Sequence, residues 1–495
     1  MLTPDLSVPN ILLTLQTGPA YRRLAQNGAM NLIELLDRAA AQWPDKPAFI
    51  EFDQPVSYAE LSVRTHSLAD RLAELAITPG CRVGLSFPNS IAYVALTFAL
   101  WKLRAVVVPL AVECTELERA EITNSLQLHS ILSPNEHAGG ILVEPGCYFT
   151  RLSPTTPADD HGLDIAFIRF TSGTTSARKG VVLCHDTVRD RIDAANQGLA
   201  ISADDTVIWC LPMAHHFLVT IVLYLSRGAT IVLARHVLAE PFLAAIQRWR
   251  GTVLYASPFH YGMLARHQAG GEIPTVRLAI STTCSLTEDI ADAFHARFKT
   301  PITQALGIIE AGLVCLNLRE PRTRWNSVGH PLPGFAVRIL SPDDDGRGEI
   351  AIRGPGLFDA YASPWVSRNE VAPDGWFRTG DIGRIDADGY LFLLSRKTAV
   401  INLAGRKVFP EEIETVLNRH PAVRESRAYG RPHPHLGEII EADLVLDADA
   451  AALDSIRAHC RAHLASYKIP TRLNVVTELP RTAVTGKIRR EVIAV

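Results

Sequence analysis

Short apolar segments alternate with helix-like segments through most of the chain, and this alternation limits the possible folds more than any other feature. The helix-like stretches are Ser90–Leu103, Thr187–Ala200, Pro241–Arg250 and Thr287–Phe298, and the apolar strand-like stretches include Ala105–Val108, Thr206–Leu211 and Ala229–Ala234. This order is typical of parallel sheets covered by helices. We therefore predict an α/β fold, with more than one helix-covered sheet in a large N-terminal domain.

The sequence changes character after about Gly329, where short strands and turns such as Asp386–Tyr390 follow one another closely. This pattern predicts a β-rich, mostly antiparallel subdomain. Beyond Arg396, two amphipathic helix patterns indicate a separate compact unit, and about 100 residues are enough for a small α+β domain. We place the N-terminal domain at residues 1–395 and the C-terminal domain at residues 396–495.

Composition excludes several classes of function. Among 495 residues, 49 are Lys or Arg and 52 are Asp or Glu, so the formal net charge is −3 and favours neither nucleic-acid nor anionic-membrane binding. The eight cysteines include no C-x-x-C pair, which disfavours zinc and redox motifs. No signal peptide or membrane span is evident, which predicts a cytoplasmic protein.

A loop rich in hydroxyl groups and glycine follows the strand-like run Ile165–Phe170. Its sequence, from Thr171 to Gly180, is TSGTTSARKG. Backbone N–H groups and short hydroxyls of such a loop can reach phosphate oxygens, and Lys179 adds positive charge. It is not the P-loop of the NTPases, because Lys179 precedes Gly180 and two valines follow in place of a helix.

This loop resembles the signature loop of the adenylate-forming (acyl-activating, AMP-binding) enzymes, which include acyl-CoA synthetases, peptide-synthetase adenylation domains and luciferases. The resemblance extends from about Asn31 to Val495. Further segments that are similar to family motifs, in chain order, are Leu211–His215, Gly307–Glu310, Trp376–Asp381, Ser395–Gly405 with Pro410 and Glu412–Glu414, and Leu479–Ile488.

The resemblance implies that a carboxylate attacks the α-phosphate of ATP with Mg²⁺ present and expels pyrophosphate. Glu310 would hold Mg²⁺, Asp381 would accept hydrogen bonds from both ribose hydroxyls, and Arg396 would hold the ribose edge. Lys487 would bridge the carboxylate and the α-phosphate, so Lys487 and Glu310 are the predicted catalytic residues. The predicted nucleotide-binding set is Thr171, Ser172, Gly173, Thr174, Thr175, Lys179, Gly307, Asp381 and Arg396.

The resemblance also implies that the C-terminal domain is mobile. Thr398 would be its hinge, and Gly405 would line the path of a thiol in a second state. Several positions depart from the family pattern. Leu306 replaces an aromatic residue, Ile309 replaces a threonine, and the stretch TTCSL from Thr282 replaces a Gly-Ala-Ala-Pro-Leu type segment.

The predicted acid-binding residues are His215, His216, Phe217, Thr282 and Ile308. No aspartate closely follows His215, which disfavours an α-amino acid as substrate. The run Ala-His-His-Phe is similar to that of stand-alone aryl acid ligases and favours an aryl acid, with a fatty acid as the alternative. His216 replaces an asparagine that meets an ortho-hydroxyl. The two histidines are alternatively core or helix-face residues.

The acceptor stays open between coenzyme A and a phosphopantetheine thiol, because both present the same arm. The predicted partners are thus a small carboxylic acid and, for the second acceptor, an acyl or peptidyl carrier protein. Two other classes compete with an acid–thiol ligase. A luciferase-like oxidase or amide-forming ligase would share the adenylation residues, and the departures at Leu306, Ile309 and Thr398 suggest a non-catalytic nucleotide-binding protein.

Overall fold

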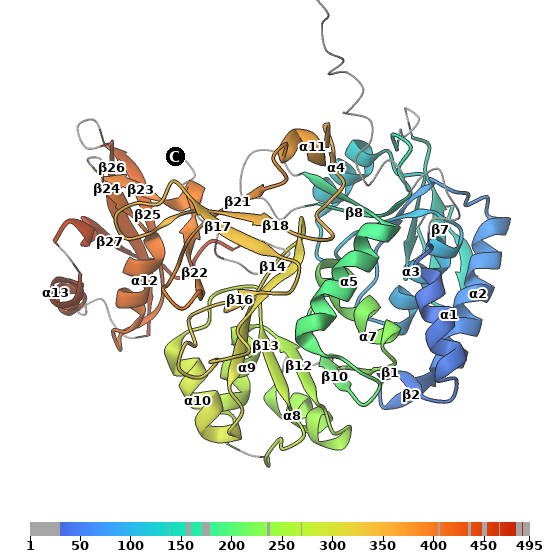
Figure 1. Ribbon diagram of the computed structural model, residues 1–495, viewed down its shortest axis with the longest axis horizontal. Helices are drawn as coiled ribbons and strands as arrows, with labels where there is room; N and C mark the ends of the chain where they lie inside the picture. Colours follow the sequence, from blue (N-terminus) through green and yellow to red (C-terminus); the bar gives the residue numbers. More distant parts are fainter. Residues whose placement is uncertain are drawn as a thin grey trace, which may run out of the picture.

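The computed structural model describes residues 30–137, 139–154, 160–170, 179–234, 238–268, 270–403, 406–433, 437–447, 453–464, 466–481 and 488. Within these residues the strands form four sheets. Figure 1 shows the two largest sheets and their helices in one part of the molecule, and the C-terminal sheet with its helices at one end.

Sheet one combines strands from distant parts of the sequence. In spatial order its strands are β16 (His330–Pro331), β15 (Gly312–Leu316), β14 (Ile302–Ile308), β13 (Leu278–Ser281), β12 (Val253–Ala256), β10 (Thr206–Trp209), β11 (Thr230–Leu233), β1 (Pro47–Glu51) and β2 (Gln54–Ser57). Strands β14 to β1 pair in parallel, and the strands at both edges are antiparallel.

In sheet two, as in sheet one, parallel strands in the middle are flanked by antiparallel strands. Its strands, in spatial order, are β20 (Trp365–Ser367), β19 (Ala360–Ala362), β9 (Gly180–Cys184), β8 (Ile165–Phe170), β4 (Val106–Pro109), β3 (Arg82–Leu85), β5 (Ser130–Ser133), β7 (Cys147–Arg151) and β6 (Ile141–Glu144). Strands β8, β4, β3 and β5 pair in parallel.

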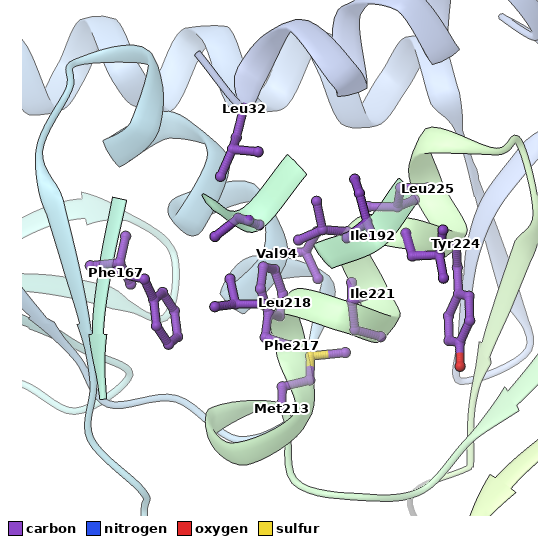
Figure 2. Close-up of a cluster of buried hydrophobic side chains, with 14 of the residues drawn as sticks. Leu32, Val94, Phe167, Ile192, Met213, Phe217, Leu218, Ile221, Tyr224 and Leu225 are labelled. Carbon is purple, nitrogen blue, oxygen red and sulfur yellow. The ribbon is translucent and has the colours of Figure 1, made fainter. Parts of the chain in front are cut away.

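Helices cover both faces of these sheets. Five helices lie between the two sheets: α1 (Ile33–Gln42), α2 (Tyr58–Glu74), α3 (Ile91–Lys102), α5 (His185–Leu199) and α7 (Val222–Ser226). Their buried side chains and those of both sheets form one hydrophobic cluster. The outer face of sheet one packs on α8 (Ala239–Arg248), α9 (Pro258–Arg266) and α10 (Glu288–Phe298), and that of sheet two packs on α4 (Glu116–Leu126). Figure 2 shows part of the central cluster, with Phe167 and Phe217 in it.

The remaining sheets follow the change in sequence character. Sheet three is antiparallel and contains β17 (Ala336–Leu340), β18 (Gly348–Arg353), β21 (Phe377–Ile385) and β22 (Leu391–Arg396), and the short helix α11 (Arg368–Val371) precedes β21. Sheet four contains β24 (Arg406–Val408), β23 (Ile401–Leu403), β26 (Gly437–Leu446), β25 (Val423–His433) and β27 (Arg472–Val475), and it packs on α12 (Pro410–Asn418) and α13 (Leu453–His463).

The predicted fold class is confirmed. Helix α2 begins with a capping box, in which the Ser57 side chain accepts from the Glu60 N–H and the Glu60 carboxylate accepts from the Ser57 N–H. The apolar face predicted for α13 is buried at Ile456 and Cys460. In the part of the chain described here, no helix is long and apolar enough to cross a membrane.

Candidate active site

Three of the predicted site residues follow the carboxyl ends of parallel strands of sheet one. His215 follows β10, Thr282 follows β13 and Glu310 follows β14. Because parallel strands end at one edge of a sheet, these positions lie together although they are far apart in the sequence, and ligands of α/β sheets bind at this edge. Some predicted residues lie outside the described residues, namely Thr171, Ser172, Gly173, Thr174, Thr175, Gly405 and Lys487. Only the backbone of Thr398 is described, in a 3₁₀ turn.

Asp381 and Arg396 are joined by the pairing of β21 and β22. They stand opposite each other in the strand register, and Arg396 Nε lies 2.8 Å from Asp381 Oδ1. The arginine side chain is 58% exposed and the aspartate side chain 15%. Gly380 precedes the aspartate with φ +72°, a backbone conformation that favours glycine. A carboxylate is thus held at the surface of the site with a cation beside it.

Glu310 lies in the turn after β14 and contacts β19 of sheet two. Tyr361 of β19 donates its hydroxyl to Glu310 Oε1 at 3.3 Å, and Lys179 Nζ lies 4.7 Å from the centre of the Tyr361 ring. Burial, aided by the negative charge of Glu310, raises the pKa of Tyr361, so this hydroxyl keeps its proton and remains a donor. Lys179 and the Glu310 carboxylate therefore contact the same tyrosine.

Arg191 of α5 fixes the turn that carries Glu310. Its guanidinium donates to the carbonyl oxygens of Ile309 and Glu310, both at 2.7 Å, and to that of Gly356. Burial lowers its pKa to about 9, which still leaves it charged at neutral pH. The position of Glu310 thus depends on a buried cation more than 100 residues away in the chain.

His216 belongs to an aromatic group beside the end of β10. Its ring centre lies 6.4 Å from Trp209 and 6.1 Å from Tyr255, and these two rings stack at 5.4 Å. Burial raises the pKa of Tyr255 to about 12, and a side-chain hydrogen bond with Thr282 opposes the rise. Three aromatic rings and a threonine hydroxyl are therefore gathered from three strand ends.

The other predicted acid-binding residues differ in their surroundings. Phe217 is 2% exposed and packs into the central cluster (Figure 2). Its ring centre lies 5.3 Å from that of Tyr93. Ile308 packs against the same cluster, whereas Gly307 is exposed. The carbonyl of His215 accepts a hydrogen bond from Arg169.

Sequence reasoning missed five residues of this site, which are Arg169, Arg191, Trp209, Tyr255 and Tyr361. One signal was present, because Arg169 interrupts an otherwise apolar strand. No group of three or more His, Cys, Asp or Glu side chains suited to a metal ion occurs among the residues with described positions. Beside phosphates, Mg²⁺ usually binds to one or two protein carboxylates and to phosphate oxygens, and the Glu310 carboxylate is chemically suited to such a role.

Comparisons with known proteins agree on one family. The family described as AMP-binding enzyme matches residues 36–362, more than half of the chain, and the AMP-binding enzyme C-terminal domain matches residues 412–487. Oxalate–CoA ligase of Arabidopsis thaliana is 28% identical over 93% of this chain and 97% of its own length. Feruloyl-CoA synthase of an Amycolatopsis species is 28% identical over 91% and 96%.

A solved structure shows the same architecture. ATP-bound MatB from Rhodopseudomonas palustris superposes with a TM-score of 0.80 at 25% sequence identity, covering 93% of this chain and 97% of that one. The match therefore includes both the helix-covered sheets and the C-terminal unit.

Proposed function

The chain belongs to the AMP-binding enzyme family, and from this premise we propose that it joins an aryl carboxylic acid to a thiol through an acyl-adenylate. The family and the enzyme class predicted from the sequence, an AMP-forming acid–thiol ligase with ATP as substrate, are confirmed by the matches to CoA ligases. The identity of the acid, the acceptor thiol and the roles of individual residues are parts of the proposal.

In the first step, the carboxylate attacks the α-phosphorus of ATP and pyrophosphate leaves. Asp381 and Arg396 are proposed to hold the ribose, and their 2.8 Å pairing presents a carboxylate whose orientation is already set. Glu310 fits a Mg²⁺ ligand, because Tyr361 occupies only one of its two oxygens. When bound, Mg²⁺ offsets negative charge on the phosphate oxygens. Lys179 and Lys487 are proposed to add positive charge from the chain.

The phosphate loop is proposed to supply the remaining nucleotide contacts. It begins directly after β8, and Lys179 and β9 follow it, so both of its ends are held by sheet two. Exposed Gly307 offers backbone without a side chain beside the Glu310 turn. This arrangement brings Lys179, Glu310 and the end of β14 to one side of the site.

The aromatic group around His216 is the observation that carries the assignment of an aryl acid. A flat ring packs well against stacked aromatic rings, with a gain of about 0.5–1.5 kcal/mol beyond the buried area. At the end of β10, next to Thr282, the half-buried His216 is the ring that a ligand can reach, and it lies against the stacked, buried rings of Trp209 and Tyr255. Feruloyl-CoA synthase, one of the relatives, is by its name specific for an aromatic acid.

In the second step, a thiol attacks the carbonyl carbon of the adenylate and AMP leaves. We place the domain boundary between residues 395 and 396, so that the C-terminal domain can turn about Thr398 and bring Gly405 to the thiol path. Coenzyme A is the favoured acceptor, because the relatives named above form CoA thioesters. A phosphopantetheine thiol on a carrier protein is the alternative.

ATP–pyrophosphate exchange with a panel of benzoates, cinnamates and C6–C16 fatty acids tests this proposal. We expect exchange with an aryl acid and little with the fatty acids. A preference for fatty acids would support the alternative, and the absence of exchange with every acid, despite ATP binding, would indicate a nucleotide-binding protein without this activity. If adenylate forms but no thioester follows, a luciferase-like or amide-forming enzyme is favoured.

The variant His216→Asn tests the pocket itself. We expect a shift in kcat/KM toward 2-hydroxybenzoates, since the amide can bond an ortho-hydroxyl. His463→Asn, on exposed α13, is the matched control. Unchanged relative kcat/KM values for the tested acids in the His216 variant would contradict the placement of His216 in the acid-binding pocket.

A further inference from the structure

Arg169 is a charged residue in a strand whose other side chains are apolar. Strand β8 lies inside sheet two, paired with β4 and β9. Side chains alternate along a strand, so Arg169 lies on the same face as Phe167, one pleat closer to the phosphate loop. Phe167 is 1% exposed in the central cluster, and Figure 2 shows its position there. Arg169 therefore lies at the boundary between this cluster and the site.

Among the described residues, much of the hydrogen-bonding capacity of Arg169 is unused. One terminal nitrogen donates to the carbonyl of His215. Its Nε is buried and has no hydrogen-bond partner among the described residues, and the same holds for the hydroxyl of neighbouring Tyr93. Burial lowers the pKa of Arg169 to about 10, while the charge of Glu310 opposes this change. The guanidinium is thus a cation at neutral pH.

Burial of a guanidinium group is energetically unfavourable unless hydrogen-bond acceptors satisfy its N–H groups. Buried charges in proteins are normally paired and hydrogen-bonded, and each unmet donor carries a penalty. The residue as a whole is nevertheless only half-buried, so a small ligand can reach part of it. Because a guanidinium fork matches a carboxylate or phosphate with two parallel hydrogen bonds, an anionic ligand group is the fitting partner.

The neighbours of Arg169 indicate which anion this is. Its bond to the His215 carbonyl places it against α6 (Met213–His216), the helix that carries the proposed acid-binding His216. The reacting carboxylate must keep an oxygen free to attack phosphorus, and a guanidinium fork would occupy both of its oxygens. The phosphates already have proposed partners in the loop and in Lys179.

We propose that Arg169 binds a second, non-reacting carboxylate of the acid, so that the preferred substrate is an aryl dicarboxylate. This inference rests on the proposed function and narrows its substrate class. It makes Arg169 a specificity-determining residue, and it explains why a strand that is otherwise apolar carries a cation.

The test compares benzoate with the three benzenedicarboxylates in ATP–pyrophosphate exchange. In the wild type, we expect kcat/KM for one dicarboxylate to exceed that for benzoate by about 10- to 100-fold, the effect of a charge-assisted hydrogen-bonded contact. Arg169→Gln should remove this advantage by raising KM for the dicarboxylate, while KM for ATP and for benzoate stays unchanged. Arg169→Lys should keep part of the advantage. Arg151→Gln, in β7 of the same sheet, is the control, because Arg151 also donates to a carbonyl but is exposed.

Each other outcome overturns the inference. Exchange with benzoate and no gain from a second carboxylate would overturn it and leave the proposed function standing. A raised KM for ATP in Arg169→Gln would assign the arginine to a phosphate. An equal loss with benzoate and the dicarboxylate, together with a lowered melting temperature, would make its role structural. If no acid supports exchange in the wild type, the proposed function fails as well.

Discussion

Glu310 is the residue on which the first chemical step most depends in the proposed mechanism. We expect Glu310→Gln to lower ATP–pyrophosphate exchange by about 10²- to 10³-fold, because a neutral amide offsets less of the positive charge of a metal ion. The exchange rate at saturating Mg²⁺ is the measurement, and Glu272→Gln at an exposed position is the control. Exchange at the wild-type rate in the Glu310→Gln variant would contradict the assignment of Glu310 as a metal ligand.

We expect Asp381 to contribute to the binding of the nucleotide and not to the binding of the acid. The change Asp381→Ala removes two acceptor oxygens and leaves exposed Arg396 without this partner. KM for ATP should rise by about 10-fold or more, the effect of losing hydrogen bonds to a charged group, with KM for the acid unchanged. Steady-state exchange with each substrate varied in turn measures both constants. An unchanged KM for ATP would contradict the ribose assignment.

At the scale of elements, α5 links the core to the site through Arg191. Arg191→Leu would leave the carbonyls of Gly356 and Ile309 without this donor, whereas that of Glu310 would keep the Phe358 N–H, and each unsatisfied buried group costs about 1–3 kcal/mol. We expect the free energy of unfolding, from urea titration, to fall by about 3 kcal/mol or more, with a parallel loss of exchange. Arg189→Leu on the same helix should cost at most about 1 kcal/mol, because its ion pairs are near the surface.

His185, at the start of α5, makes the same helix sensitive to acid. The side chain is 1% exposed, its Nδ1 accepts from the Leu32 N–H at 3.2 Å, and burial lowers its pKa to about 4. Between pH 6.5 and pH 4 the unfolded chain binds more protons at His185 than the folded chain does. The contribution of neutral His185 to the free energy of unfolding is therefore complete above pH 6.5 and is lost as the pH falls.

The expected size of this loss is about 3 kcal/mol between pH 7 and pH 4. Urea titrations at several pH values should show a shallower pH dependence in His185→Asn, whose amide oxygen can still accept from Leu32. The exposed His463→Asn should retain the wild-type dependence. Identical slopes in all three proteins would contradict the origin assigned to the acid sensitivity.

At the scale of the whole molecule, the C-terminal unit is joined to the rest by surface ion pairs. Arg347 lies 3.3 Å from Glu412, and Arg419 lies 3.5 Å from Glu288. Pairs of this kind contribute at most about 1 kcal/mol each, so breaking them opposes a rotation of the unit only weakly. This arrangement is compatible with two positions of the C-terminal unit, one for each half-reaction.

Two variants separate these half-reactions. Lys487→Ala should lower exchange by about 10²- to 10³-fold, yet still pass a pre-made acyl-adenylate to the thiol. Gly405→Leu should spare exchange and abolish thioester formation, because a side chain would block the thiol. Both half-reactions are measured on both variants, with circular dichroism as the check of fold. Equal loss of both steps in each variant would contradict the division of labour.

Features carried by neighbouring residues could be determined from the sequence alone. The alternation of apolar and amphipathic segments predicted helix-covered parallel sheets, because periodicity is a local property. The order of family motifs indicated the enzyme class, and placed Glu310, Asp381 and Arg396 among the candidates before any contact was known.

The contacts between distant segments were decided only by the tertiary structure. Asp381 meets Arg396 because β21 and β22 pair in one register, and Arg191 reaches the Glu310 turn from a helix far away in the chain. Phe217 lies in the core next to His216 of the site, since the direction of each side chain depends on what packs against it. Arg169 is the one charged residue of β8, and only the tertiary structure brings it to the His215 carbonyl, because strand ends from separate parts of the chain converge there.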